Sequence, residues 1–260
     1  MLSDTDRQAA ADAILKAETT QKVCVQPSTT WPGMTLEDAY DIQRRWAAAR
    51  VARGARIVGR KIGLTSRAMQ RASKMTEPDY GVILDDALFS DGARIAAGTF
   101  IKPRLEVELA FVMAEDLSGA GCRVHDVLRA TEMVVPALEI IDYRTEVPRR
   151  IADTIADNAA FGAIVTGGRP VRPFDVDLPR VGATLSQNGV IEETGLAAGV
   201  MGHPAAGLAW LVTKLAEQDE GLKKGDIVLG GSFTRPVDIA AGDVIQADFG
   251  PLGGIGVSFE

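Results

Sequence analysis

The stretch Pro103-Arg104-Leu105-Glu106-Val107-Glu108-Leu109-Ala110-Phe111 alternates polar and apolar side chains with the period of a β-strand. Successive side chains of a strand point to opposite faces, so Glu106 and Glu108 share one face, roughly 6.6 Å apart. The other face carries apolar side chains that are expected to enter a core: Leu105, Val107, Leu109 and Phe111. Two like charges on one buried face repel, and a divalent cation is the natural partner for clustered carboxylate oxygens.

A third carboxylate, Glu139, stands inside the apolar run at residues 134–141. An ionised carboxylate without a partner is costly to bury. Three glutamates from two apolar segments can form one face of oxygen ligands and leave metal positions free for water and substrate. The residues alone leave a second interpretation open, in which Glu106 and Glu108 face solvent on a half-exposed strand.

The composition indicates an ordinary globular protein of one large domain or two small ones, with 46% hydrophobic and 24% charged side chains in 260 residues. A net charge of −7 argues against a general nucleic-acid binder but permits a local basic pocket for a small anion. The two cysteines, Cys24 and Cys122, are too few for a disulfide framework or a cysteine zinc site. Without a leader-like start or a stretch of membrane-span length, a cytoplasmic protein with no membrane partner is expected.

The pattern of the chain is helical first and mostly β afterwards. An Ala-rich helical pattern covers residues 6–22, and a capping-box-like start at Thr35 opens a second helix. The later segments predict a strand at 56–64, short helices at 66–73, 124–131 and 204–215, and a loop at 77–81. We therefore expect an N-terminal helical region, residues 1–55, and a β-rich catalytic domain, residues 56–260.

Lys61 lies between two glycines, in a segment whose apolar neighbours favour burial. A buried lysine can lose its proton near neutral pH and serve as an acid or base, whereas an exposed strand lysine has no such role. Asp79 is equally open to two interpretations, because an aspartate after proline is common as a turn former.

Four motifs carry a resemblance: Gly59-Arg60-Lys61-Ile62-Gly63-Leu64-Thr65-Ser66, Glu77-Pro78-Asp79-Tyr80-Gly81, Arg104-Leu105-Glu106-Val107-Glu108-Leu109-Ala110-Phe111 and Pro136-Ala137-Leu138-Glu139-Ile140-Ile141-Asp142. Later segments extend it, among them Asp157-Asn158-Ala159-Ala160, His203-Pro204-Ala205 and Gly230-Gly231-Ser232-Phe233-Thr234-Arg235-Pro236. In this order, over nearly the whole chain, they resemble the hydratase and decarboxylase branch of the fumarylacetoacetate hydrolase superfamily.

The resemblance implies an α+β fold, with a mixed, strongly bent β-sheet or β-roll, an N-terminal helical region and peripheral helices, assembled into a homo-oligomer. It implies that Mg²⁺ or Mn²⁺ is bound by three glutamates: Glu106, Glu108 and Glu139. Lys61 matches the active-site lysine of the family and Asp79 its partner acid. Thr234 matches a position that holds the C1 carboxylate of the substrate.

The activity that the resemblance implies is addition of water to 2-hydroxyhepta-2,4-diene-1,7-dioate, or 2-oxoheptenedioate, giving 4-hydroxy-2-oxoheptane-1,7-dioate in homoprotocatechuate degradation, a branch of aromatic catabolism. The segment at residues 232–236 resembles the seven-carbon hydratases, whereas decarboxylases and five-carbon hydratases tend to carry a small Ala-Leu sequence there. A guanidinium suits a carboxylate, so Arg235 or Arg60 could pair with the far carboxylate of this 2-oxo dicarboxylate. A surface role is the open alternative for each.

The sequence leaves other functions open. Decarboxylation of 2-oxo-3-hexenedioate, or hydration of 2-hydroxypenta-2,4-dienoate, would use the same metal and lysine. A C–C hydrolase of the superfamily activates water with a Glu and His pair near the N-terminal side, but His125 and His203 lie elsewhere and are expected to act as cap or packing residues. A structural partner subunit of the decarboxylase would not need the three glutamates and Lys61 together.

Overall fold

The computed structural model describes the backbone of residues 1–260 and every side chain except those of residues 68 and 72. The helices are α1 (Asp4–Thr20), α2 (Pro27–Thr30), α3 (Leu36–Ala52), α4 (Arg67–Ala72), α5 (Val124–Ala130), α6 (Ile151–Ala156) and α7 (Ala205–Ala216). Short 3-10 turns are η1 (Asp85–Ala87), η2 (Asn158–Ala160), η3 (Leu178–Arg180), η4 (Ala197–Gly199) and η5 (Gly250–Leu252). In the described residues, no helix is both long and apolar enough to cross a membrane.

The strands are β1 (Ile57–Gly63), β2 (Asp79–Leu84), β3 (Leu88–Ser90), β4 (Ala93–Ile95), β5 (Arg104–Met113), β6 (Leu117–Ser118), β7 (Thr131–Ile141), β8 (Phe161–Thr166), β9 (Gly182–Gln187), β10 (Val190–Leu196), β11 (Gly221–Leu222), β12 (Ile227–Leu229), β13 (Val237–Asp238), β14 (Val244–Asp248) and β15 (Gly254–Phe259). One mixed sheet has the order β2-β1-β12-β5-β7-β8-β3, with β13 paired to β5. A second sheet has the order β10-β9-β14-β15-β4.

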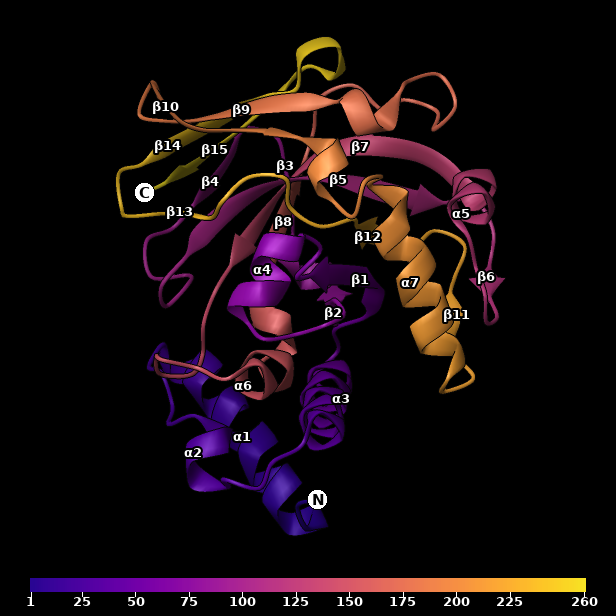
Figure 1. Cartoon of the computed structure of the whole chain (residues 1–260). Helices are drawn as coiled ribbons and strands as arrows, with labels where there is room; N and C mark the ends of the chain where they lie inside the picture. The colour runs from indigo at the N-terminus through magenta and orange to yellow at the C-terminus, as the bar shows by residue number, and fades with distance from the viewer.

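Figure 1 shows the second sheet at one end of the molecule, the helices α1, α2, α3 and α6 at the other, and α7 along one side. The main hydrophobic core joins the large sheet to the second sheet and to α7, through buried side chains that include Leu105, Phe111, Leu138, Leu185, Leu211 and Ile245. This arrangement confirms the expected α+β fold with curled mixed sheets and peripheral helices.

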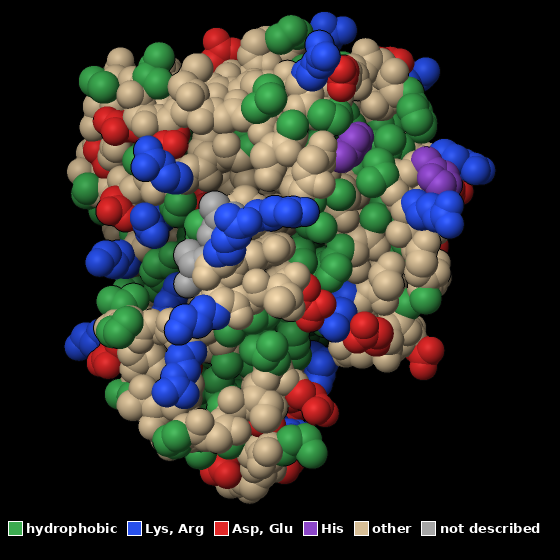
Figure 2. Space-filling view, viewed as in Figure 1, with side chains coloured by type: hydrophobic (Ala, Val, Ile, Leu, Met, Phe, Trp, Pro, Cys, Tyr) green, Lys and Arg blue, Asp and Glu red, His purple; other side chains and the backbone are tan. Residues whose placement is uncertain are grey.

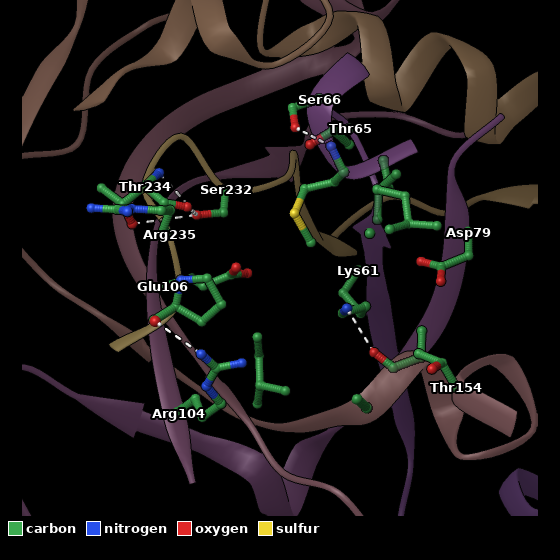
Figure 3. Close-up of a pocket in the computed structure, with 18 of the residues that line it drawn as sticks. Lys61, Thr65, Ser66, Asp79, Arg104, Glu106, Thr154, Ser232, Thr234 and Arg235 are labelled. Carbon is green, nitrogen blue, oxygen red and sulfur yellow. Dashed lines mark hydrogen bonds between the residues drawn. The ribbon is translucent and has the colours of Figure 1, made fainter. Parts of the chain in front are cut away.

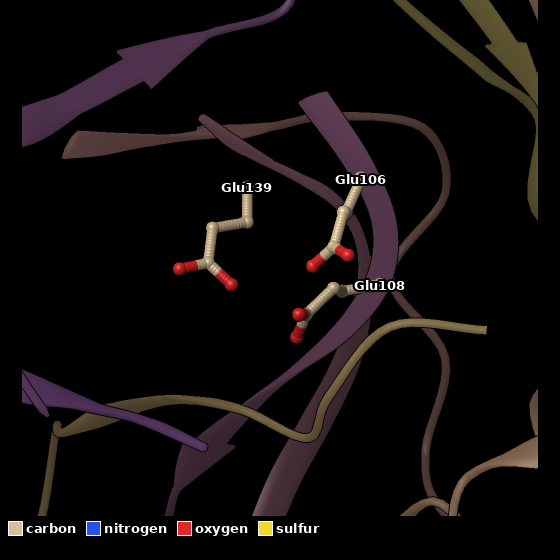
Figure 4. A group of neighbouring side chains, drawn as sticks. All are labelled: Glu106, Glu108 and Glu139. Atoms are coloured by element: carbon tan, nitrogen blue, oxygen red, sulfur yellow. The ribbon is translucent and has the colours of Figure 1, made fainter. Parts of the chain in front are cut away.

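Strand β5 follows the alternation that its sequence predicts. Leu105, Val107 and Phe111 are fully buried on the core face. The opposite face carries Glu106 and Glu108 toward the interior of the curled sheet (Figure 4). Because both faces of β5 are covered, its two glutamates lie in a far drier setting than those of a half-exposed strand.

The N-terminal helices form close to where the sequence predicts them, although α1 begins and ends two residues before the expected bounds of 6 and 22. Ser3 accepts a hydrogen bond from the Asp6 amide at the start of α1, and Thr35 and Asp38 form a capping box at the start of α3. Their shared core includes Ile155 of α6 together with side chains of β2. The helical region is therefore packed directly onto elements of the β-rich part.

The loop predicted at residues 77–81 is wrong in its second half. Strand β2 begins at Asp79, which pairs with Gly63 of β1 in an antiparallel register. Pairing along six residues outweighs the local turn preference of Pro78-Asp79, and Asp79 becomes a buried strand residue. This difference matters for the site, because a strand fixes the direction of the Asp79 side chain.

The close approach of β1 and β12 requires glycine at position 59. A Cβ atom there would lie well inside contact distance of the Ile227 carbonyl oxygen, across a parallel pairing of the two strands. We expect Gly59→Ala to destabilise the protein by roughly 3 kcal/mol, since backbone must shift to make room. Urea unfolding measures the change.

Gly33→Ala is the matched control, because a Cβ at Gly33 meets no atom within 4 Å. Its free energy of unfolding should stay within about 0.5 kcal/mol of the parent. Equal stability of the two variants would contradict the close approach of β1 and β12.

Candidate metal centre and active site

The three glutamates predicted as metal ligands meet at one point. Antiparallel pairing of β5 with β7 places Glu106 directly opposite Glu139, and Glu108 follows on the same face of β5. One carboxylate oxygen from each residue lies within 4.8 Å of the others (Figure 4). Glu108 and Glu139 are each 1% exposed, so water does not screen their charges.

The charges of this cluster are unbalanced unless a cation or protons join it. Burial, reinforced by the neighbouring Glu139, raises the pKa of Glu106 to about 8. Burial and the same neighbour raise the pKa of Glu108 well above its ordinary value. Glu108 accepts a hydrogen bond from the Gly231 amide at 2.8 Å, whereas Glu139 Oε1 is buried and forms an ion pair with Lys61 but no aligned hydrogen bond.

An all-oxygen donor set, buried and short of partners, fits a hard divalent cation. The expectation of a divalent metal is thereby supported by this chain's own geometry. The donor set has the same chemistry for Mg²⁺ and Mn²⁺.

Lys61 projects from β1 toward the glutamates and is almost fully buried. Its Nζ lies 3.1 Å from Glu139 Oε1 and donates a hydrogen bond to the Ala159 carbonyl oxygen at 2.9 Å (Figure 3). Burial alone would lower the pKa of Lys61, but the carboxylates of Glu139 and Asp79 outweigh it and raise the pKa. Without a metal, Lys61 is therefore protonated and positively charged, whereas burial by itself would favour the neutral amine.

The Ala159 carbonyl, which accepts the hydrogen bond from Lys61, belongs to an unusual turn. Asn158, Ala159 and Ala160 all have positive φ, between 50° and 58°, a region that residues with a side chain rarely adopt. The Asn158 amide clamps the turn to β2, because it accepts a hydrogen bond from the Val82 amide at 2.8 Å and donates one to the Val82 carbonyl at 2.9 Å. Local backbone strain at this motif thus serves to aim one carbonyl at the lysine.

Asp79 faces the same space from the neighbouring strand. Asp79 is 2% exposed, and its Oδ1 has no hydrogen-bond partner. Burial raises the pKa of Asp79, while the Lys61 cation opposes the shift. A Cβ on Gly63 would overlap Asp79 Oδ1 and lie 3.4 Å from Lys61 Nζ, so glycine at 63 leaves room for both groups.

Lys61, Asp79 and Glu106 line one cavity of about 570 Å³. Its far wall includes the segment 232–236, and Figure 3 shows Ser232 and Thr234 across the space from Lys61. The Thr234 hydroxyl accepts a hydrogen bond from the Val107 amide at 3.1 Å, which ties this segment to β5 beside Glu106. The predicted C1-carboxylate residue is thus brought to the metal side of the cavity.

The two arginines proposed for the far carboxylate have different positions. Arg235 lines the rim of the cavity, but its side chain is 83% exposed and pairs with Glu193 at 2.6 Å. Arg60 lies on the face of β1 opposite to that of Lys61, where it pairs with Glu220 at 3.4 Å. It is not among the described residues that line the cavity. The structure does not bring Arg60 to the site.

The lining residues that the sequence analysis did not single out include Arg104, Tyr143 and Arg149. The signal for Arg104 was present, because it precedes Glu106 by two residues and so shares its face of β5. Tyr143 and Arg149 lie in the irregular segment between β7 and α6, where no period indicates direction.

His203 is a capping residue, as expected: its Nδ1 accepts a hydrogen bond from the Ala205 amide at the start of α7. His125 is exposed on α5 and pairs with Asp126. Neither is among the described residues that line the cavity.

Basic side chains gather on the face that carries α4. Figure 2 shows Lys and Arg side chains around this helix and beside it, although the net charge of the chain is −7. Arg67 and Arg71 of α4 are exposed, and Met69 of the same helix lines the cavity. A positive mouth attracts anionic substrates in spite of the overall negative charge.

Comparison with known proteins gives a family. The sequence matches the family described as fumarylacetoacetate (FAA) hydrolase C-terminal over residues 49–258. It is 51% identical over 239 residues to 2-oxo-hept-4-ene-1,7-dioate hydratase of Escherichia coli, covering 89% of this chain and 90% of that protein. It is 34% identical over 260 residues to 2-keto-4-pentenoate hydratase of Paraburkholderia xenovorans, covering 100% and 97%.

A solved structure of 4-oxalocrotonate decarboxylase from Pseudomonas putida G7, complexed with magnesium and adipate, matches with a TM-score of 0.97 at 34% identity. The match covers 100% of this chain and 99% of that one. This chain belongs to the fumarylacetoacetate hydrolase family and is an enzyme of its hydratase and decarboxylase branch.

The raised pKa of Glu106 predicts how metal-free protein responds to pH. The folded pKa of about 8 lies above the ordinary value of 4.5, so folded protein keeps a proton that the unfolded chain has released. The free energy of unfolding should therefore fall as pH rises from about 5 to about 8. Thermal melts in EDTA at several pH values measure this fall.

Added Mg²⁺ should remove most of the fall, because the cation replaces the protons on the carboxylates. Glu106→Gln should make the metal-free profile less steep, since glutamine has no proton to release, while Glu108 with its raised pKa remains. A metal-free profile that is flat in the parent protein would show that Glu106 is not held protonated.

Proposed function

We propose that this enzyme is a divalent-metal-dependent hydro-lyase that adds water to 2-hydroxyhepta-2,4-diene-1,7-dioate, or 2-oxoheptenedioate, in homoprotocatechuate degradation. The product is 4-hydroxy-2-oxoheptane-1,7-dioate. One observation carries the proposal: Lys61, Asp79 and Glu106 line a single cavity and Glu106 clusters with Glu108 and Glu139, in a chain that is 51% identical to a hydratase named for this substrate.

The residues that would hold the cation are Glu106, Glu108 and Glu139, and Mg²⁺ is the ion we propose, with Mn²⁺ as its alternative. When bound there, it would act as a Lewis acid toward the carboxylate and 2-oxo group of the substrate. Thr234 would hold the C1 carboxylate, because its hydroxyl sits beside Glu106 on a segment fixed to β5.

Lys61 and Asp79 would move the protons. In the first stage the 2-hydroxyl loses its proton and C5 gains one, which gives the conjugated 2-oxo-3-ene. In the second stage the oxygen of water bonds to C4, water releases one proton, and C3 gains a proton to complete the alcohol. Asp79, with its raised pKa, and the Lys61 cation can each carry a proton at neutral pH.

Decarboxylation of a six-carbon 2-oxo-enedioate is the second candidate. The close structural match to a decarboxylase favours it, since the same glutamates and lysine could serve either reaction. The higher identity to the seven-carbon hydratase supports hydration instead. A purely structural subunit would gain nothing from a buried carboxylate cluster that costs stability.

Product analysis by NMR tests the reaction. The purified protein is incubated with Mg²⁺ and 2-hydroxyhepta-2,4-diene-1,7-dioate, with the six-carbon 2-hydroxy-dienedioate, and with 2-hydroxypenta-2,4-dienoate. We expect 4-hydroxy-2-oxoheptane-1,7-dioate as the main product of the first and slower turnover of the others. Carbon dioxide from the six-carbon compound, with little hydration of the seven-carbon one, would establish the decarboxylase instead.

Glu106→Gln tests the metal centre. Removing one charged ligand should lower Mg²⁺-dependent kcat/KM by about 100-fold or more, while circular dichroism stays native. Glu115→Gln is the matched control, because Glu115 is exposed and is not among the lining residues. Full activity of Glu106→Gln without added metal would rule out this centre.

A further inference from the structure

Arg149 stands at the cavity wall as a buried cation without a full partner. Its side chain is 11% exposed, and its Nη1 is buried with no hydrogen-bond partner. The carboxylate nearest to it in the described ion pairs, Asp157, lies 3.9 Å away. That carboxylate is already bound by the backbone amide and side chain of Arg144, so it does not satisfy the second guanidinium.

The Arg149 guanidinium is held in position by an aromatic ring. Its Cζ lies 3.5 Å from the centre of the Tyr143 ring, a cation–π contact that orients the planar group. Burial lowers the pKa of Arg149, because the neighbouring groups stabilise the cation less than the lost hydration did. A buried, oriented and incompletely paired guanidinium facing a cavity is suited to a carboxylate ligand.

Arg104 joins it from β5. It shares a face with Glu106, roughly 6.6 Å further along the strand, and Figure 3 shows its guanidinium on the Glu106 side of the cavity. Its carboxylate partner, Asp238, is 79% exposed, so this ion pair is weak and exchangeable. Arg104 also donates a hydrogen bond to the Pro236 carbonyl at 3.3 Å.

The cavity wall therefore carries groups of opposite charge. Glu106 brings the carboxylate cluster to the cavity, and the guanidinium groups of Arg104 and Arg149 line the same cavity. Six C–C bonds in an extended chain span roughly 7–8 Å, close to the two-residue step from Glu106 to Arg104. A seven-carbon dioate held by its 2-oxo acid end can thus reach the level of Arg104 with its other end, in the cavity that Arg149 also lines.

We propose that Arg149, assisted by Arg104, binds the far carboxylate of a 2-oxo dicarboxylate and makes the enzyme selective for substrates with two acid ends. This inference rests on the proposed function, because it assumes that the 2-oxo acid end lies at the glutamates. It replaces Arg60, which faces away, and Arg235, which is exposed at the rim and paired with Glu193.

Calorimetric titration of the Mg²⁺-loaded full-length protein tests the assignment without turnover. The ligands are 2-oxoheptanedioate and 2-oxoheptanoate, which differ only at the far end and have no double bond to hydrate. The parent protein should bind the dioate about ten-fold or more tightly. Arg149→Met should bring the ratio of the two affinities close to one, with 2-oxoheptanoate affinity changed by less than about two-fold.

Arg150→Met is the matched control, because Arg150 is the next residue, is exposed and is not among the lining residues. It should leave both affinities unchanged. If Arg149→Met fails to fold, Arg149→Lys carries the test, since it keeps a charge near Asp157 but loses the bidentate fork, and the ratio should fall several-fold.

An unchanged ratio in the Arg149 variants, or an equal loss of both affinities, would overturn the assignment and leave the proposed function standing. Failure of the parent protein to bind either ligand in the presence of Mg²⁺ would overturn both.

Discussion

The pairing of β5 with β7 is the constraint on which the rest of the site depends. Its register sets Glu106 opposite Glu139, and the period of β5 adds Glu108 to the same face. A shift of one residue would turn the glutamates into the core and expose the apolar side chains, so hydrophobic burial fixes the register. The energy of the core thus holds together three carboxyl groups that would repel one another once ionised.

That cluster makes the metal-free site a region of stored electrostatic energy, and its neighbours are arranged around the charges. Lys61 offsets part of the negative charge and is itself held by the Ala159 carbonyl. The left-handed turn that supplies this carbonyl is maintained by Asn158, which binds both backbone groups of Val82. Strained backbone and clustered buried carboxylates in one place are typical of a site built for a ligand.

In the proposed assignment, the glutamates with Lys61 and Asp79 hold the 2-oxo acid group and the arginines hold the far carboxylate. Arg104 shares β5 with Glu106, whereas Arg149 lies in the irregular segment between β7 and α6. A change at position 149 can therefore alter the arginine side of the cavity while the strand pairing that holds the glutamates is kept.

The sequence by itself determined the start of α3, the strand character of β5 and β7, the family and the three glutamates, because these follow from local periodicity and motif. It also held a signal that Arg60 and Lys61 face opposite ways, since adjacent strand residues alternate. Only the tertiary structure decided that Asp79 is a buried strand residue, that the Ala159 carbonyl accepts a hydrogen bond from Lys61, and that Arg149 lines the cavity. Those positions depend on pairing with distant strands and on irregular segments, where no local period indicates which way a side chain points.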